Sequence, residues 1–274
     1  MDSEICDFFK FAEKTGEEKY QKKVLPNVLG QLFDETIENP REFFKKKMED
    51  PMAAMTFFLN WSFIRGRNDE LSLFYARCAI EAIKDVSGSN GINLYRFLSN
   101  NKINIILEKF QEKVCDMSKK EKGKEYKTNE KDISLLKSTF EKFKDTKDAN
   151  YNAVKFLKQK IKNEGINAAY DWLISIIEIG DKIAGCILRD IIWLYGLEKV
   201  MKSKKDKEAL TPVDTWVRQI IEDLYDKEKL SKNEIKNKII EGCNNCDTSL
   251  IAVNQGIWYI GSHSWNIIKE LLKI

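Results

Sequence analysis

The fold of this chain is decided by the stretch Ile176-Ile-Glu-Ile-Gly-Asp-Lys-Ile-Ala-Gly-Cys-Ile-Leu-Arg-Asp-Ile-Ile-Trp-Leu-Tyr195. It predicts a helix that ends near Ile177, a short turn over residues 178–180, and a second helix that begins at about Asp181. Apolar side chains recur almost all round the second helix, which is typical of a helix buried in the middle of a domain. We therefore expect a helix–turn–helix at the centre of the fold.

The rest of the chain has the same helical character. Only 4 prolines and 13 glycines interrupt 274 residues, and apolar side chains recur at three- and four-residue spacing nearly everywhere. Strand-like alternation is scarce, so the sequence predicts an all-α protein with about ten to fourteen helices of the usual length. Residues 85–91 and 118–129 have the composition of surface connectors. The second connector either is a plain solvated loop or separates two helical subdomains, 1–125 and 126–274, with the C-terminal helix able to pack on the first.

The composition excludes several classes of chemistry. The net charge of +3, from 46 basic and 43 acidic residues, is too balanced to indicate a nucleic-acid-binding protein by itself. His263 is the single histidine, so sites built on two or three histidines are impossible. We expect it to be a surface histidine or one with satisfied hydrogen bonds, in preference to a pocket residue. The sequence has no phosphate-binding loop and no dinucleotide-binding turn, so no nucleotide cofactor is expected.

The cysteines and the apolar runs bear on where the protein works. The first residues are acidic and lack the long apolar core of a secretory signal. No apolar run approaches the roughly 18–20 residues that span a bilayer. These features predict a cytoplasmic protein with reduced thiols and no membrane association. Cys243 and Cys246 form a lone CxxC, which we interpret as structural or incidental and not as a metal site.

Lys182 occupies an unusual position in the first turn of the second helix. The positive end of the helix dipole disfavours a cation there, and burial would lower the pKa of the lysine further. A lysine must lose its proton to act as a nucleophile, so the position suits amine chemistry. The alternative is an ordinary lysine paired with Glu178 or Asp181. Backbone N–H groups around Gly180 also form a natural seat for a phosphate.

A second informative segment is Leu210-Thr-Pro-Val-Asp-Thr-Trp-Val-Arg-Gln-Ile-Ile221. Pro212 fixes the chain just before a predicted helix, and Asp214 lies at the expected N-cap. Taken alone, Asp214 is therefore a helix cap.

The two segments together suggest a known family. Gly180-Asp-Lys-Ile-Ala-Gly-Cys-Ile187 and Pro212-Val-Asp-Thr-Trp-Val-Arg218 resemble the site segments of helix-hairpin-helix DNA glycosylases that carry a catalytic lysine. The long interval from Lys182 to Asp214, with its basic insert 202–207, is similar to that of the archaeal 8-oxoguanine DNA glycosylase/AP lyase family. The hairpin departs from the family pattern, because Ile176-Ile-Glu-Ile-Gly180 keeps only the final glycine.

The resemblance implies two helical subdomains with a cleft between them. It also implies a bifunctional enzyme that flips an oxidised purine, 8-oxoguanine above all, out of double-stranded DNA and excises it. Lys182 would be the nucleophile and Asp214 its acidic partner, with no metal or organic cofactor. We expect a monomer.

Further site residues follow from the same resemblance. The segment Asn254-Gln-Gly-Ile-Trp-Tyr-Ile-Gly261 resembles the final helix of the archaeal family, which makes Trp258 a stacking candidate. The expected base-binding residues are Trp258, Trp61, Gln31 and Asn60. The expected DNA-backbone contacts are Gly180, Asp181, Arg65, Arg67, Lys202, Lys204 and Lys205. Each tryptophan could instead fill the core, and each basic residue could be ordinary solvated surface.

Two other classes of function stay open at the level of sequence. One is a non-catalytic helix-hairpin-helix module that docks on DNA phosphates and removes no base. The other is a helical interaction protein with no role in nucleic-acid binding, in which Lys182 is simply solvated.

Overall fold

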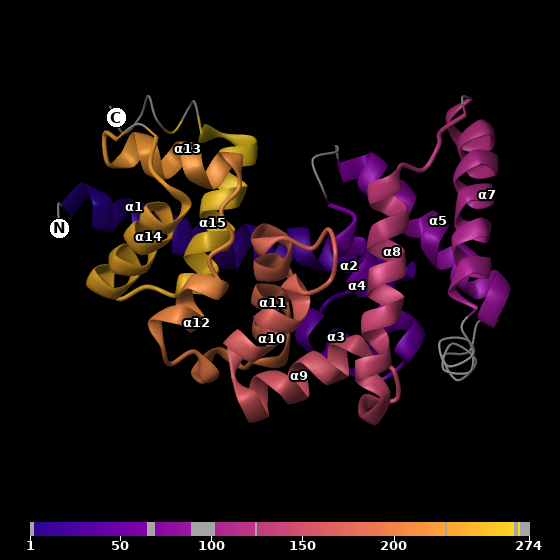
Figure 1. The fold of residues 1–274 in the computed structure, drawn as a ribbon. Helices are drawn as coiled ribbons and strands as arrows, with labels where there is room; N and C mark the ends of the chain where they lie inside the picture. The colour runs from indigo at the N-terminus through magenta and orange to yellow at the C-terminus, as the bar shows by residue number, and fades with distance from the viewer. Residues whose placement is uncertain are drawn as a thin grey trace. The chain divides into compact units, whose positions relative to one another are not determined.

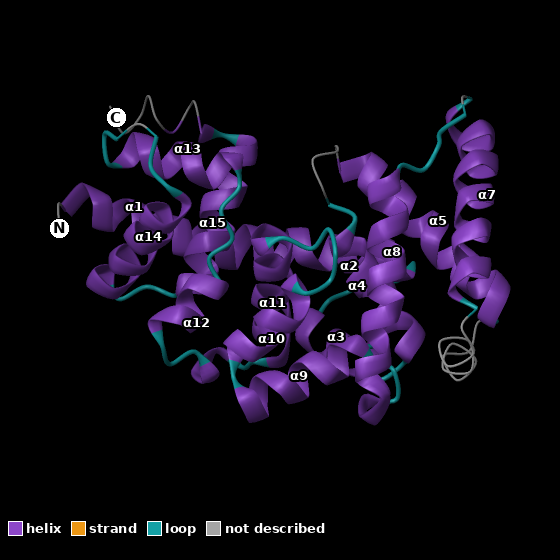
Figure 2. Ribbon diagram, in the orientation of Figure 1, coloured by secondary structure: helices purple, strands orange, loops and turns teal. Residues whose placement is uncertain are grey.

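The computed structural model describes residues 3–64, 69–88, 102–123, 125–227, 229–265 and 268. Within these ranges the chain forms helices joined by loops and turns, and no strand is present (Figure 2). The predicted all-α class is therefore confirmed.

The chain divides into two compact units. Unit 1 combines Met1–Arg41 with Leu188–Ile274, and unit 2 is Glu42–Ile187. This division differs from the one expected at residue 125, because the N-terminal helices pack with the C-terminal ones. Two helices contain a boundary between units, namely α3 (Pro40–Lys47) and α11 (Asp181–Tyr195). Both helices are labelled in Figure 1.

The remaining helices fall within one unit each. Unit 1 contains α1 (Ser3–Thr15), η1 (Gly16–Val24), α2 (Leu25–Phe33), η3 (Glu198–Val200), α12 (Lys204–Ala209), α13 (Thr215–Leu224), α14 (Lys232–Cys246) and α15 (Leu250–His263). Unit 2 contains α4 (Pro51–Ser62), α5 (Asp69–Ser87), α7 (Ile103–Lys122), α8 (Glu130–Phe143), η2 (Lys144–Ala149), α9 (Ala153–Glu164) and α10 (Ile166–Ile174).

The core of unit 1 forms where α1, α13, α14 and α15 pack together. Phe8 and Phe9 of α1 are fully buried against apolar residues of the three C-terminal helices. Glycine allows α1 and α15 to approach closely, since a Cβ added at Gly256 would overlap the carbonyl oxygen of Ala12. The first and last parts of the chain therefore share one apolar core.

A π-helix, η1, follows α1 without a break. Helices with this wider turn are rare, and most are single-turn bulges near functional sites. In η1 the adjacent residues Tyr20 and Gln21 are both buried. Both side chains enter the interior of unit 1.

A disulfide joins Cys6 of α1 to Cys246 at the end of α14, with 5.3 Å between the Cα atoms. The expectation that all thiols are reduced was therefore wrong for this pair. The bond connects residues 240 positions apart, a pairing that sequence spacing cannot indicate. Cys246 of the CxxC is thus structural, while Cys243 is a buried thiol outside the disulfide.

Unit 2 is organised around α4, whose side chains are buried on nearly every face. Asp50 caps α4 by accepting hydrogen bonds from the N–H groups of Met52 and Ala53. Rings of Phe58, Phe143 and Trp172 pack together in its core. An all-buried helix of this kind fixes the position of every side chain it carries.

Both connectors expected from composition are shorter than predicted. Helix α5 continues to Ser87 and α7 continues to Lys122, so part of each connector is helical. In the second case the non-helical chain begins only at Gly123, whose φ of 66° ends the helix. At the first connector, residues 85–87 form the last turn of α5, which ends before Gly88 at a φ of 74°. At the second, lysine-rich sequence is compatible with helix as well as with loop.

Across the described residues, no helix combines the length and the apolar character that crossing a membrane requires.

Candidate functional site

The predicted helix–turn–helix is present, with its first helix, its turn and the start of its second helix in unit 2. Helix α10 ends at Ile174, three residues earlier than expected, and α11 begins at Asp181 as predicted. Ile176 and Ile179 of the turn are buried, whereas Ile177 is 59% exposed. The Ile177 N–H donates to Ser138 Oγ at 2.9 Å, which fixes the turn against α8.

The hairpin backbone differs at two positions from what its residues suggest. Glu178 has a φ of 72°, a left-handed conformation that glycine adopts far more readily. Gly180 is exposed, its φ is not positive, and a Cβ there would meet no atom within 4 Å. In the protein without DNA, neither the backbone conformation nor the packing at position 180 requires glycine. A small residue there leaves the backbone open to a ligand.

Lys182 lies in the first turn of α11 and is half-buried. Its neighbour Asp181 accepts a hydrogen bond from the Tyr170 hydroxyl through Oδ1, at 2.6 Å. Burial, together with this carboxylate, raises the pKa of Tyr170. The hydrogen bond ties the start of α11 to α10. The Asp181 side chain, expected to face DNA, is engaged within the protein.

Asp214 is the N-cap of α13 in unit 1, as its sequence position predicted. Its Oδ1 accepts a hydrogen bond from the Val217 N–H at 2.9 Å. The side chain is half-buried, and the preceding segment 209–213 is buried and mostly non-helical. The cap fixes the orientation of the carboxylate at the start of α13.

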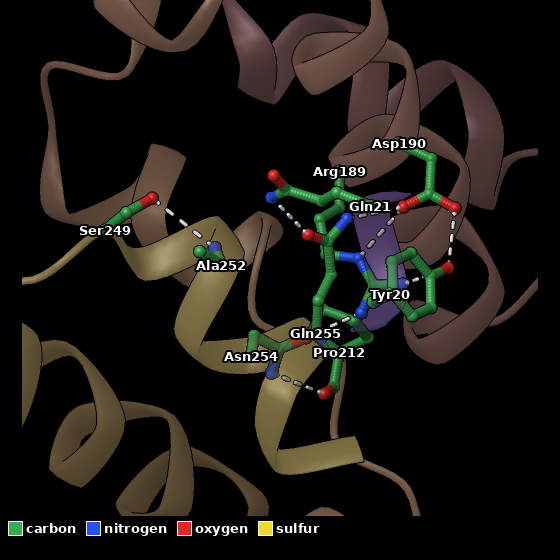
Figure 3. A network of polar contacts seen from close by, with 9 residues as sticks. All are labelled: Tyr20, Gln21, Arg189, Asp190, Pro212, Ser249, Ala252, Asn254 and Gln255. Carbon is green, nitrogen blue, oxygen red and sulfur yellow. Dashed lines mark hydrogen bonds and ion pairs between the residues drawn. The ribbon is translucent and has the colours of Figure 1, made fainter. Parts of the chain in front are cut away.

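A buried polar network, not predicted from the sequence, lies within unit 1 (Figure 3). Its charged members are Arg189 and Asp190 on α11, which are 3% and 0% exposed. Arg189 Nε donates to Asp190 Oδ1 at 3.2 Å, and Arg189 Nη2 donates to the Tyr20 hydroxyl at 3.0 Å. The Tyr20 hydroxyl donates to Asp190 Oδ2 at 3.0 Å. Burial raises the pKa of Asp190, and the charge of Arg189 acts in the opposite direction.

The network extends through amide side chains to the Asp214 segment. Gln255 Nε2 donates to Asp190 Oδ1 at 3.2 Å, and Gln21 Nε2 donates to Gln255 Oε1 at 2.8 Å. Arg189 Nη1 donates to Asn254 Oδ1 at 2.9 Å. Asn254 Nδ2 in turn donates to the Pro212 carbonyl oxygen at 3.2 Å. Asn254 thus links the buried residues of η1, α11 and α15 to the loop that precedes Asp214 (Figure 3).

The base-binding candidates lie in different environments. Trp258 of α15 is half-buried and meets the Tyr20 ring edge-on, with ring centroids 5.8 Å apart. Gln31 of α2 is exposed. In unit 2, Asn60 Oδ1 and Trp61 Nε1 are buried and have no hydrogen-bond partner. Buried polar atoms without a hydrogen-bond partner are uncommon in folded proteins.

The backbone-contact candidates could be located only in part. Arg65 and Arg67 lie outside the described residues. Lys202, Lys204 and Lys205 are exposed around the start of α12. Lys204 lies 3.8 Å from Glu208, an exposed pair that contributes little to stability. Exposure leaves these lysines accessible to phosphate, as it does for any surface lysine.

The predicted site residues are shared between the two units. Unit 1 holds Asp214, Trp258, Gln31, Lys202, Lys204 and Lys205. Unit 2 holds Lys182, Gly180, Asp181, Asn60 and Trp61.

Comparisons with protein-family models, with curated proteins and with solved structures gave no match. The likeness to helix-hairpin-helix glycosylases therefore rests on the residues of this chain alone.

Proposed function

We propose that the protein is a bifunctional DNA glycosylase and AP lyase that removes an oxidised purine, with 8-oxoguanine as the first substrate to test. One observation carries the proposal: a half-buried lysine, Lys182, lies in the first turn of α11, directly after a hairpin whose backbone is open at Gly180. A nucleophile and a phosphate seat are thus adjacent in the chain. The amine could be placed against the sugar of a nucleotide whose phosphate binds at the hairpin.

Lys182 supplies the covalent chemistry in this proposal. Its neutral Nζ attacks C1′ of the flipped nucleotide, and the glycosidic bond breaks with its electron pair leaving on the base, which takes up a proton. Opening of the sugar ring gives a Schiff base between Nζ and C1′. Loss of a proton from C2′ then expels the 3′ phosphate, which is the lyase step.

Asp214 supplies the negative charge. The sugar becomes cationic as the base departs, and a carboxylate in a fixed orientation stabilises that charge. The N-cap hydrogen bond to Val217 uses Oδ1 and supplies this orientation. Asp214 also serves to carry protons between the leaving base and the sugar.

The remaining candidates are assigned to DNA binding. The Gly180 backbone and the exposed Lys202, Lys204 and Lys205 contact phosphates. Asn60 and Trp61 are assigned to the edge of the flipped base, whose entry would have to expose their buried polar atoms.

The decisive experiment traps the Schiff base. The protein is mixed with an 8-oxoguanine duplex and borohydride, which reduces the C=N bond and leaves a permanent protein–DNA adduct. We expect an adduct with wild-type protein, none with Lys182→Ala, and an unchanged amount with Lys137→Ala, an exposed lysine of α8 in the same unit. Absence of both adduct and strand cleavage, on this duplex and on a panel of other lesions, would reject the proposed enzymatic function.

A second candidate function is a non-catalytic DNA-binding module. The hairpin sequence favours this candidate, because Glu178 stands where the usual Leu-Pro-Gly-Val-Gly hairpin of the resembled family has its first glycine. Duplex binding that weakens steeply with salt but yields neither adduct nor free base would identify such a module.

A further inference from the structure

We infer that Asn254 is a positioning residue for Asp214, acting through a hydrogen bond from its side-chain amide to the Pro212 carbonyl oxygen. The inference rests on the proposed function for the role of Asp214. Asn254 is fully buried on α15, contacts the backbone two residues before the carboxylate, and belongs to no predicted site.

The orientation of the Asn254 amide is determined by its two partners. Arginine can only donate hydrogen bonds, and a backbone carbonyl can only accept them. Asn254 lies between Arg189 Nη1 and Pro212 O, so its oxygen must face Arg189 and its NH₂ group must face Pro212 (Figure 3). The opposite orientation would lose both hydrogen bonds. The amide therefore holds the Pro212 carbonyl in a single position.

The backbone carbonyl groups of residues 211–213 require hydrogen-bond donors from outside the segment. Thr211, Pro212 and Val213 are buried and lie outside any helix, so their carbonyl groups have no helical hydrogen bonds. A buried carbonyl without a donor is costly. Pro212 also has no N–H of its own, so its carbonyl oxygen is its one backbone hydrogen-bonding group. Asn254 supplies the donor.

The support behind Asn254 is rigid. Arg189 is held by the Asp190 carboxylate and by the Tyr20 hydroxyl, all within the interior of unit 1. Movement of the Asn254 amide would leave Arg189 Nη1 without this acceptor, and a buried donor without an acceptor is costly. Hydrogen bonds among residues of η1 and α11 thus fix the Asn254 side chain of α15, which in turn fixes the loop that ends at Asp214.

The test replaces Asn254 by leucine, which has nearly the same size and forms no side-chain hydrogen bond. The matched control is Asn152→Leu, since Asn152 is equally buried and its Nδ2 donates to the Met48 carbonyl oxygen in unit 2. Single-turnover excision is measured well below the melting temperature of both variants, with saturating protein. We expect Asn254→Leu to slow excision about 10²-fold with little change in the dissociation constant for DNA, and Asn152→Leu to stay near wild type.

A double-mutant cycle separates positioning from general damage. If Asn254 acts through Asp214, Asn254→Leu causes no further loss of rate in an Asp214→Asn background. Losses that multiply would overturn the inference, as would equal losses in Asn254→Leu and Asn152→Leu.

A readout without catalysis keeps the two proposals apart. Asp214 Oδ1 protects the Val217 amide, so loosening of the loop should speed hydrogen exchange at Val217 in Asn254→Leu but not in Asn152→Leu. If the wild-type protein excises no base, the proposed function fails while this measurement still decides the inference. Unchanged Val217 exchange in Asn254→Leu would reject the positioning role.

Discussion

At the scale of single residues, Asp214 combines a structural contact with a proposed catalytic charge, and substitution can separate them. Asparagine is as good an N-cap as aspartate, whereas alanine cannot cap. We expect Asp214→Asn to keep the free energy of unfolding close to wild type and Asp214→Ala to lower it by about 1 kcal/mol. Urea unfolding measures both. The two variants should lose excision activity alike, because each removes the charge.

Equal destabilisation by the two substitutions would show that Val217 is not capped by this side chain. Full activity in Asp214→Asn would remove the carboxylate from the mechanism and leave Asp214 as a helix cap only.

Substitution of Gly180 tests whether the hairpin backbone binds a DNA phosphate. Gly180→Ala meets no atom and no backbone strain in the free protein, so its melting temperature should stay the same or rise slightly. We expect duplex binding to weaken, since a methyl group would stand where the backbone meets phosphate. The comparison is Gly165→Ala, at a φ of 97°, which should cost about 1–3 kcal/mol of stability and leave DNA affinity unchanged. Unaltered affinity in Gly180→Ala would place the phosphate elsewhere.

At the scale of helices, the approach of α15 to α1 depends on glycine. In Gly256→Ala the new methyl group would overlap the Ala12 carbonyl, and both atoms belong to buried helices that cannot shift independently. We expect a loss of about 3 kcal/mol or more in the free energy of unfolding, at the upper end for overpacking. Chemical denaturation measures it, with Gly180→Ala as the matched glycine substitution. A loss under about 1 kcal/mol would mean that α1 and α15 can separate at little cost.

Helix boundaries could be predicted from the sequence only where neighbouring residues determine them. The start of α11 at Asp181 and the cap at Asp214 were predicted because each depends on a few neighbouring residues. The end of α5 was missed because residues 85–87 belong to a cluster of turn-forming residues, and the end of α7 was missed because lysine-rich segments suit loops and helices alike. These errors are local and small.

The buried network was missed for another reason. Its members come from three distant segments, and no local pattern links Tyr20 to Asn254. One signal was available: Arg189 and Asp190 are charged residues inside an otherwise apolar helix, and such a helix must provide them with buried partners. That signal predicts that a network exists but does not identify the residues that complete it.

At the scale of the whole molecule, the Cys6–Cys246 disulfide closes nearly the entire chain into a loop. Cross-linking residues 240 positions apart restricts the unfolded chain strongly, which corresponds to as much as about 5 kcal/mol of stability. We expect Cys6→Ser, and reduction of the wild-type protein, to lower the melting temperature by similar amounts. Cys115→Ser, at a half-buried cysteine of α7 outside the disulfide, should not. If reductant leaves the melting temperature of the wild-type protein unchanged, Cys6 and Cys246 do not form a disulfide in solution.

Unit 1 is formed by the N-terminal segment and the C-terminal segment, and unit 2 lies between them in the sequence. During translation, α1 and η1 emerge about 190 residues before α13, α14 and α15, the helices that bury Phe8 and Phe9. At roughly 5–20 residues per second, the early segment waits on the order of 10–40 s for its packing partners. Nascent chains should therefore expose an apolar helix to ribosome-associated chaperones for most of synthesis. The tertiary structure of unit 1 can form only after α15 has left the exit tunnel.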